Sequence, residues 1–238
     1  MSEAARIVLA SASPRRLELL RSLNFNVLVM PSNYDEPEHP HLSPRDHAIV
    51  HARHKCEDVR RRLELAAPSG KVHEEATLRR LEETGAPTQL GGAEVRPERL
   101  LTVAADTVVD VDGIAYNKPT DAQDAKRMLR DLSGRTHIVH TAFALAVPNH
   151  EQLVEHCEST FVTFFPLSDD EIDAYVATGE PMDKAGAYGI QAYGATLVER
   201  VEGDFYTVMG FPLARFVRSL HRLGIALPIT NAGTSDRS

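Results

Sequence analysis

The sequence predicts an α/β protein with a mixed, twisted sheet flanked by helices. Segments with strand-like and helix-like patterns alternate along the chain, and no internal repeat interrupts them. The composition, 42% hydrophobic and 25% charged over 238 residues, is typical of a folded globular protein. We expect a single domain over residues 1–228, followed by a disordered tail at 229–238.

The first predicted elements are a strand, a tight turn and a helix. Residues 6–10, RIVLA, form a short continuous apolar run, which is the pattern of a buried strand. Ser13 and Pro14 begin a helix that ends near Leu23, because Ser is a favoured N-cap and Pro suits the first helical position. Asn24 can then close this helix in the left-handed conformation.

A long helix and a polar insertion follow a second strand with the sequence FNVLVMP. Ser43 and Pro44 repeat the Ser-Pro helix start, and the pattern extends this helix to Arg62. Residues 66–99 are polar, with Gly and Pro at both ends. We expect a surface insertion there, with at most one short exposed helix.

The second half of the chain begins with a predicted hairpin, LLTVAADTVVDVDGIAYNKP, whose turn is the Asp-Gly pair at 112–113. Thr120 and Gln123 predict a capping box for the next helix. Two β-rich segments follow, at 136–147 and 153–165. A helix that begins at SDDEI, a Gly/Ala-rich loop DKAGAYGIQAYG, the strand ATLVERV and a last helix complete the chain.

Composition and charge argue against several classes of protein. A net charge of -8 does not suit a general nucleic-acid or membrane-surface binder. No apolar run approaches the roughly 18 residues of a membrane span, and the first residues do not resemble a secretory signal. Cys56 and Cys157 are the only cysteines, which fits a reducing compartment. We therefore expect a cytoplasmic protein that holds any anionic ligand by a local basic cluster.

Two adjacent arginines, Arg15 and Arg16, fall at the start of the first predicted helix. The helix macrodipole is already positive there, so each cation costs about 0.3–1 kcal/mol unless an anion is bound. Free backbone N–H groups and two guanidinium groups together suit a phosphate chain. The alternatives are a solvated pair, or an ion pair with Glu18 or Glu36. The cost of the placement favours the phosphate interpretation.

Asp106 is a charged residue inside the otherwise apolar run TVAADTVV. Its burial is unfavourable unless the carboxylate is paired or binds a cation. Beside a phosphate site, a divalent cation would cancel the repulsion between carboxylate and phosphate, and Glu36 is a candidate second ligand. The alternatives are that Asp106 bonds local backbone at a bulge or strand end, and that Glu36 lies on a loop surface.

Lysines and histidines offer further candidates. Lys55, Lys118 and Lys184 suit phosphate, although each alone is also consistent with a surface residue, and Lys118 is the best placed. His47 and His51 share a helix face, but the pair lacks the Glu of a zinc-protease motif, so the sequence does not favour zinc. A Ser/His/Asp hydrolase is not supported, because no Gly-x-Ser-x-Gly turn occurs.

Seven motifs occur in order along residues 7–223: LASASPRRLELL, HARHK, AADTVV, KP, LSGRTHIVHT, EPMDKAGAYGIQ and GDFYTVMGFPL. Together they resemble the Maf (septum-formation) family of nucleoside triphosphate pyrophosphatases. The resemblance implies one two-lobed catalytic domain of the inosine-triphosphatase-like type, with its active site in the cleft between the lobes. It also implies a homodimer and a divalent cation such as Mg²⁺, Mn²⁺ or Co²⁺.

The resemblance also implies residue roles. Asp106 would be the catalytic acceptor and, with Glu36, a metal ligand. Phosphate contacts would come from five residues: Ser13, Arg15, Arg16, Lys55 and Lys118. Selectivity would come from three residues that match the dTTP/UTP branch rather than the 7-methyl-GTP branch: Arg15, Thr107 and Gln191.

The implied reaction is attack of water on the α-phosphorus of dTTP, UTP or modified pyrimidine triphosphates, which releases the monophosphate and pyrophosphate. Whether Asp106 acts as a general base or only as a metal ligand is open at this point. The alternatives to this function are a regulator of cell division that binds nucleotides without turnover, and the 7-methyl-GTP branch of the same family.

Overall fold

The computed structural model describes residues 6–37, 39–66, 100–148 and 150–228. In these ranges seven strands form one mixed sheet in the spatial order β2-β1-β3-β5-β6-β7, with β4 paired to the edge of β3. The pairs of β1 with β2 and β3 are parallel, and the remaining pairs are antiparallel. The strands are β1 Arg6–Leu9, β2 Asn26–Val29, β3 Leu100–Val111, β4 Ile114–Tyr116, β5 Thr136–Ala146, β6 Val154–Phe164 and β7 Val198–Glu202.

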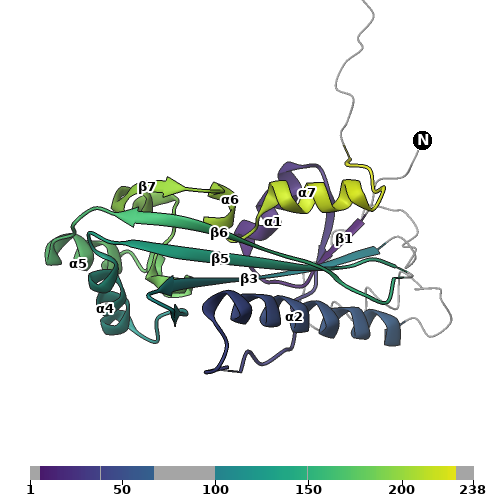
Figure 1. Cartoon of the computed structure of the whole chain (residues 1–238), viewed down its shortest axis with the longest axis horizontal. Helices are drawn as coiled ribbons and strands as arrows, with labels where there is room; N and C mark the ends of the chain where they lie inside the picture. The colour runs from purple at the N-terminus through teal and green to yellow at the C-terminus, as the bar shows by residue number, and fades with distance from the viewer. Residues whose placement is uncertain (1–5, 38, 67–99, 149, 229–238) are drawn as a thin grey trace, which may run out of the picture.

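Helices cover both faces of the sheet. The long helix α2 runs along one face, whereas α1 and α7 cover the opposite face at one end and α4 and α5 pack at the other end (Figure 1). The α-helices are α1 Pro14–Ser22, α2 Pro44–Ala66, α4 Ala122–Leu132, α5 Asp169–Ala177, α6 Phe205–Val208 and α7 Leu213–Arg222. The 3₁₀ helices are η2 Glu180–Asp183, η3 Ala185–Ala187 and η4 Ala192–Leu197. The predicted α/β class with a mixed sheet is confirmed.

The alternation of side chains along β3 divides the core. Leu101, Val103 and Ala105 belong to a cluster beneath α1 and α7, and Val109 belongs to a second cluster with α4 and α5. Even-numbered residues such as Val108 point to a third cluster beneath α2. Successive strand residues face opposite sides of a sheet, so odd-numbered and even-numbered residues of β3 enter different clusters. On the odd-numbered side, the two ends of the strand enter separate clusters, and β3 therefore contributes to all three.

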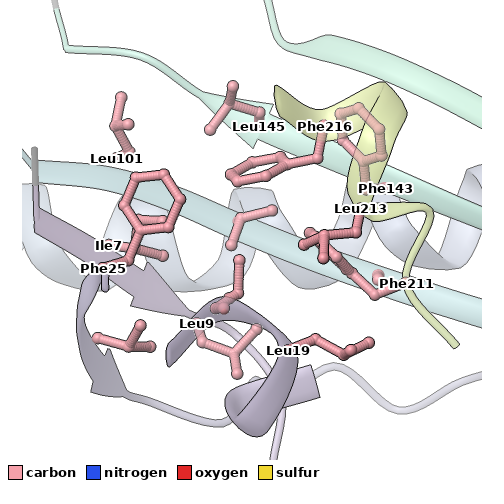
Figure 2. Packing of buried hydrophobic residues seen from close by; sticks show 14 of the residues in the cluster. Ile7, Leu9, Leu19, Phe25, Leu101, Phe143, Leu145, Phe211, Leu213 and Phe216 are labelled. Carbon is pink, nitrogen blue, oxygen red and sulfur yellow. The ribbon is translucent and has the colours of Figure 1, made fainter. Parts of the chain in front are cut away.

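Aromatic rings fill the first of these clusters. Phe216 of α7 makes edge-on contacts with Phe25, Phe143 and Phe211, at ring-centroid distances of 6.1, 5.7 and 5.1 Å (Figure 2). Edge-to-face packing of this kind stabilises a core beyond the area that it buries. These contacts attach the C-terminal helix α7 to the β1 end of the sheet.

An interruption along one edge of β3 separates the two ends of the molecule. β1 pairs with residues 100–103 of β3, and β4 pairs with residues 109–111. Between these two pairings, the edge of β3 has no strand partner within the described part of the chain. Asp106 and Thr107 lie in this interval. Ligand sites in α/β folds form where neighbouring connections diverge in this way.

Several local predictions are confirmed. Asn24 closes α1 at a φ of 61°, and the 112–113 turn has φ values of 54° and 83°, as a type I′ hairpin requires. Ser168 and Glu171 form a complete capping box at α5. These features depend on neighbouring residues only.

The predicted capping box at α4 is wrong. The N-cap is Asp121, whose side chain accepts a hydrogen bond from the Asp124 backbone N–H. The Asp124 side chain in turn accepts one from the backbone N–H of Thr120, so carboxylates take both acceptor positions. The helix therefore begins one residue later than a Thr120–Gln123 box requires.

The predicted insertion at 66–99 lies outside the described residues except for Ala66, and the predicted tail at 229–238 lies wholly outside them. The single domain over 1–228 stays a prediction. Among the helices of the described ranges, none combines the length and apolar character that crossing a membrane requires.

Candidate active site

The interruption beside β3 opens into a cleft of about 940 Å³. Its walls come from the start of α1, from α2, from the middle of β3, from the β4–α4 connection and from the turns at 180–192 and 208–210. This volume is in the range of small-molecule sites. The cleft brings together every residue that the sequence analysis assigned to the site: Ser13, Arg15, Arg16, Glu36, Lys55, Asp106, Thr107, Lys118 and Gln191.

Lys55 bridges two carboxylates on the α2 side of the cleft. Its Nζ donates to Asp106 Oδ1 at 2.7 Å and lies 2.8 Å from Glu36 Oε1. Asp106 is 7% exposed and Lys55 9%, whereas Glu36 is exposed. Burial raises the pKa of Glu36, but the charge and hydrogen bond of Lys55 and the charges of His51 and Lys118 outweigh it, so the net pKa is lowered. Asp106 does not lie at a bulge or strand end, because its pairing with β5 is regular, whereas Glu36 is exposed on a loop, as one alternative had it, and reaches Lys55 from there.

The carboxylate pair fits a hard divalent cation. Both carboxylates direct an oxygen at one position, which the Lys55 ammonium takes here, so both can reach a shared positive charge. Within the described residues, no cluster of three or more His, Cys, Asp or Glu side chains can hold a metal ion by itself. The donor set therefore suits a cation such as Mg²⁺, which takes one or two carboxylates and completes its shell with phosphate oxygens and water.

Arg16 is held on the other side of β3 by three uncharged acceptors. Its guanidinium donates to the backbone oxygen of Gly210 at 2.9 Å, to Ser11 Oγ at 3.1 Å and to Thr107 Oγ1 at 3.1 Å. Thr107 Oγ1 also hydrogen-bonds Thr141 Oγ1 at 3.0 Å. Burial lowers the pKa of Arg16, and the nearby Asp106 opposes this effect. Arg16 therefore joins α1, β3 and the 208–210 turn, with two of its five N–H donors left over.

Arg15 and Ser13 remain more accessible. Arg15 Nη1 lies 3.7 Å from Asp183 Oδ2, and among the described residues neither arginine pairs with Glu18 or Glu36, as one alternative had required. Ser13 is the N-cap of α1, but its side chain makes no capping hydrogen bond, and the first turn contains no acid. The helix start thus keeps donors available for an anion.

The predicted lysines and Gln191 differ in how they are held. Lys118 is exposed and makes no hydrogen bond or ion pair with any residue that the structure describes. Lys184 is instead paired with Asp183, at 2.7 Å. Gln191 is the exposed N-cap of η4 and its side chain makes no capping bond. Lys118 and Gln191 are therefore free to contact a ligand.

Buried hydrogen bonds hold the loop that carries Gln191. Tyr188 Oη lies 2.7 Å from His137 Nε2, and burial lowers the pKa of His137 to about 4. Tyr175 Oη accepts from the backbone N–H of Gly189 at 3.1 Å. A Cβ on Gly194 would lie 2.0 Å from the backbone oxygen of Gly189, so no larger residue fits there without a shift of the loop. The loop position is thus set by the core.

The comparison with known proteins agrees with the motifs. The family model described as Maf-like protein matches residues 6–223. The chain belongs to the Maf family. The dTTP/UTP pyrophosphatase of Bacillus velezensis is 38% identical over 220 residues, which is 92% of this chain and 97% of the relative. Proteins of the same name from Symbiobacterium thermophilum and Thermus thermophilus are 40% identical over 96% and 88% of this chain, and over 99% and 90% of their own lengths.

Sequence reasoning missed several residues that position this Maf-family site. Thr141, Asp183 and Tyr188 act through contacts with segments far away in the chain. Their one sequence signal is that they fall inside the motifs LSGRTHIVHT and EPMDKAGAYGIQ. A motif shows where such residues are, but it does not show which partners they meet.

Proposed function

We propose that this Maf-family chain is an enzyme that hydrolyses dTTP and UTP to the nucleoside monophosphate and pyrophosphate. The observation that carries the proposal is the Lys55 bridge between Asp106 and Glu36, in a cleft that also contains the start of α1. Relatives 35–40% identical over most of the chain are named dTTP/UTP pyrophosphatase, which supports the substrate class. A triphosphate needs cations and N–H donors, and its hydrolysis needs a group that handles the proton of water.

The triphosphate would lie between the start of α1 and the lysines. Arg15, Lys118 and the helix N–H groups have donors free for phosphate oxygens, and Ser13 can add its hydroxyl. Arg16 would contribute charge and its two remaining donors, while its bonds to protein keep α1 in place. This arrangement stabilises negative charge through groups that are already oriented.

In the proposed reaction, the oxygen of water bonds to the α-phosphorus, and the bond from that phosphorus to the bridging oxygen breaks. The electron pair leaves with pyrophosphate. Asp106 orients the water and accepts its proton, which then passes to solvent. A divalent cation held by Asp106 and Glu36 would neutralise phosphate charge and lower the pKa of a bound water. Lys55 can keep the two carboxylates near each other before the substrate arrives.

Selectivity would come from Gln191, because its side-chain amide has a donor and an acceptor that can pair with the edge of a pyrimidine. Thr107 has a different role, because its hydroxyl already forms hydrogen bonds with Arg16 and Thr141. We propose that Thr107 positions Arg16 and does not contact the base. This assignment refines the selectivity set that the family resemblance implies.

The test is release of pyrophosphate from dTTP, UTP, other nucleoside triphosphates and 7-methyl-GTP, with Mg²⁺, Mn²⁺ or Co²⁺. We expect metal-dependent turnover of dTTP and UTP, and a loss of about 10²–10³ or more in turnover for Asp106→Asn. Asp170→Asn is the matched control, because Asp170 is an exposed residue of α5 and does not line the cleft. Nucleotide binding with no pyrophosphate would overturn the proposal in favour of a regulator, and preference for 7-methyl-GTP would favour the other branch.

A further inference from the structure

Two buried histidines extend the row of side chains that contains Lys55. His47, His51 and Lys55 follow one another at four-residue intervals on α2, so they lie on the same face of the helix. His47 is 8% exposed and His51 2%, and both line the cleft. Their Nε2 atoms are 3.3 Å apart, and the two rings meet edge-on at a centroid distance of 4.2 Å.

We propose that His47 and His51 bind a divalent transition metal such as Zn²⁺ or Co²⁺ through their two Nε2 atoms. Zn–N bonds are about 2.0–2.1 Å, so two such bonds at a tetrahedral angle place the nitrogen atoms about 3.4 Å apart. The pair already has this separation. A metal ion is thus accommodated by small ring movements, with no change in α2.

The remaining coordination positions would face the cleft. Among the described residues no third His, Cys, Asp or Glu already converges on the pair, so water or a phosphate oxygen would complete the shell. His39 lies nearby, with its ring centroid 5.7 Å from that of His47 and 5.6 Å from that of His51. Its Nε2 is buried and has no hydrogen-bond partner within the described residues, but the three rings do not form a ready three-ligand site.

The surrounding charges and hydrogen bonds limit the affinity. The negative charges of Asp106 and Glu36 act at His51 and would attract a metal cation there. The positive charge of Lys55 would repel that cation. His51 Nδ1 has no acceptor among the described residues, and loss of such an outer-shell partner typically weakens metal binding about 10–100-fold. We therefore expect micromolar binding.

The ligand type separates this site from the carboxylate pair. Imidazole nitrogen suits Zn²⁺, Co²⁺ and Ni²⁺, while Mg²⁺ prefers carboxylate, phosphate and water oxygens. The sequence did not favour zinc here because the Glu of a protease motif is missing, but simple binding of a metal does not require that residue. The inference does not depend on the proposed pyrophosphatase activity.

The experiment is a titration of the full chain, purified without a histidine tag, with Co²⁺ in the absence of nucleotide. Visible absorption of Co²⁺ reports the ligands, and competition by Zn²⁺ reports the affinity. We expect one equivalent at micromolar concentration, not displaced by Mg²⁺. In the double variant His47→Gln/His51→Gln we expect at least a tenfold weaker affinity, with the absorption band lost.

Two control variants locate the bound metal. Asp106→Asn removes a carboxylate ligand, and His221→Gln removes an exposed histidine of α7. Both should keep the Co²⁺ band. Unchanged binding in the double variant, loss of the band only in Asp106→Asn, or no binding by the unmodified protein would each overturn the proposal. Thermal unfolding by circular dichroism checks the fold, and the single variants replace the double variant if it unfolds early.

Discussion

On the α2 face of β3, Asp106 reaches the cleft beside Lys55 and Glu36, whereas on the opposite face Thr107 reaches it among uncharged oxygens around Arg16. The first group is held by ion pairs, one of them with the exposed Glu36. The second is held by bonds to hydroxyls and to a backbone carbonyl. Adjacent residues of one strand therefore enter two different environments.

The contrast indicates a division of tasks between the two faces. Ion pairs around Lys55 respond to any charge that enters the cleft, because the ammonium faces two carboxylates and a bound cation would compete for them. The acceptors of Arg16 carry no charge, so a cation that enters the cleft has little attraction for them. We infer that the residues on the α2 face take part in the reaction, and that the residues on the Thr107 face hold the surrounding elements in position.

The largest expected effect follows from Lys55→Met. The change leaves the buried Asp106 next to Glu36 with no positive partner between them, so we expect a loss of about 10²–10³ in turnover. Removal of one partner of a buried pair also costs about 3–5 kcal/mol in the free energy of unfolding. Lys118→Met is the control, because the exposed Lys118 should affect turnover only. Equal urea stability of the two variants would contradict the structural importance of the bridge.

A lower pH should reduce the free energy of unfolding through His137, which lies on the Thr107 face and is 2% exposed. Burial lowers the pKa of this histidine from 6.5 to about 4. Between these pH values the unfolded chain binds a proton that the folded chain does not, so stability is lost as the pH falls. At 1.36 kcal/mol per pH unit, the loss is about 3 kcal/mol by pH 4. Urea unfolding from pH 7 to 4 measures it.

His137→Gln should remove this part of the pH dependence, while His41→Gln, which changes an exposed residue, should keep it. If the two variants lose stability in parallel with the unmodified protein, His137 is not the group responsible. In that case the neutral His137–Tyr188 bond does not control the stability of the loop.

Arg16→Lys and Arg15→Lys compare the two arginines directly. A lysine cannot reproduce the hydrogen bonds that the Arg16 guanidinium makes to three separate acceptors. We therefore expect Arg16→Lys to lose about 1.5–3 kcal/mol in the free energy of unfolding. Within the described residues Arg15 makes a single accessible ion pair, so its replacement should cost under about 0.5 kcal/mol and mainly raise KM. A larger stability loss for Arg15→Lys would reverse the assignment of roles.

The smallest expected effect comes from Ser13→Ala. Since the Ser13 side chain makes no capping bond, stability should change by less than about 0.5 kcal/mol, whereas Ser168→Ala should cost about 1 kcal/mol. Denaturant unfolding compares the two variants. A raised KM for Ser13→Ala with unchanged stability would agree with a contact to phosphate, and a stability loss equal to that of Ser168→Ala would argue for an ordinary cap.

Local features were predictable from the sequence because they depend on neighbouring residues. The left-handed Asn24, the turn at 112–113 and the Ser168 box satisfy backbone groups within a few positions. The error at α4 has the same origin, since Thr120 and Asp121 are adjacent candidates for one N-cap: the Thr120–Gln123 spacing suggested a capping box, but Asp is the stronger N-cap residue. The residue types at the site, including Asp106, also pointed to phosphate and metal chemistry.

The sequence by itself thus determined the order of the main strands and helices, the family and the set of candidate residues, but not α6 or the 3₁₀ helices, of which η4 takes the first residues of the predicted strand ATLVERV. Only the tertiary structure decided how they act. Lys55 and Asp106 are 51 positions apart, and Arg16 and Thr107 are 91 apart. Their pairing depends on β1 and β4 leaving the middle of β3 open, with α2 on one face and α1 on the other. Long-range packing sets burial and therefore sets which charges are paired, and no local pattern records it.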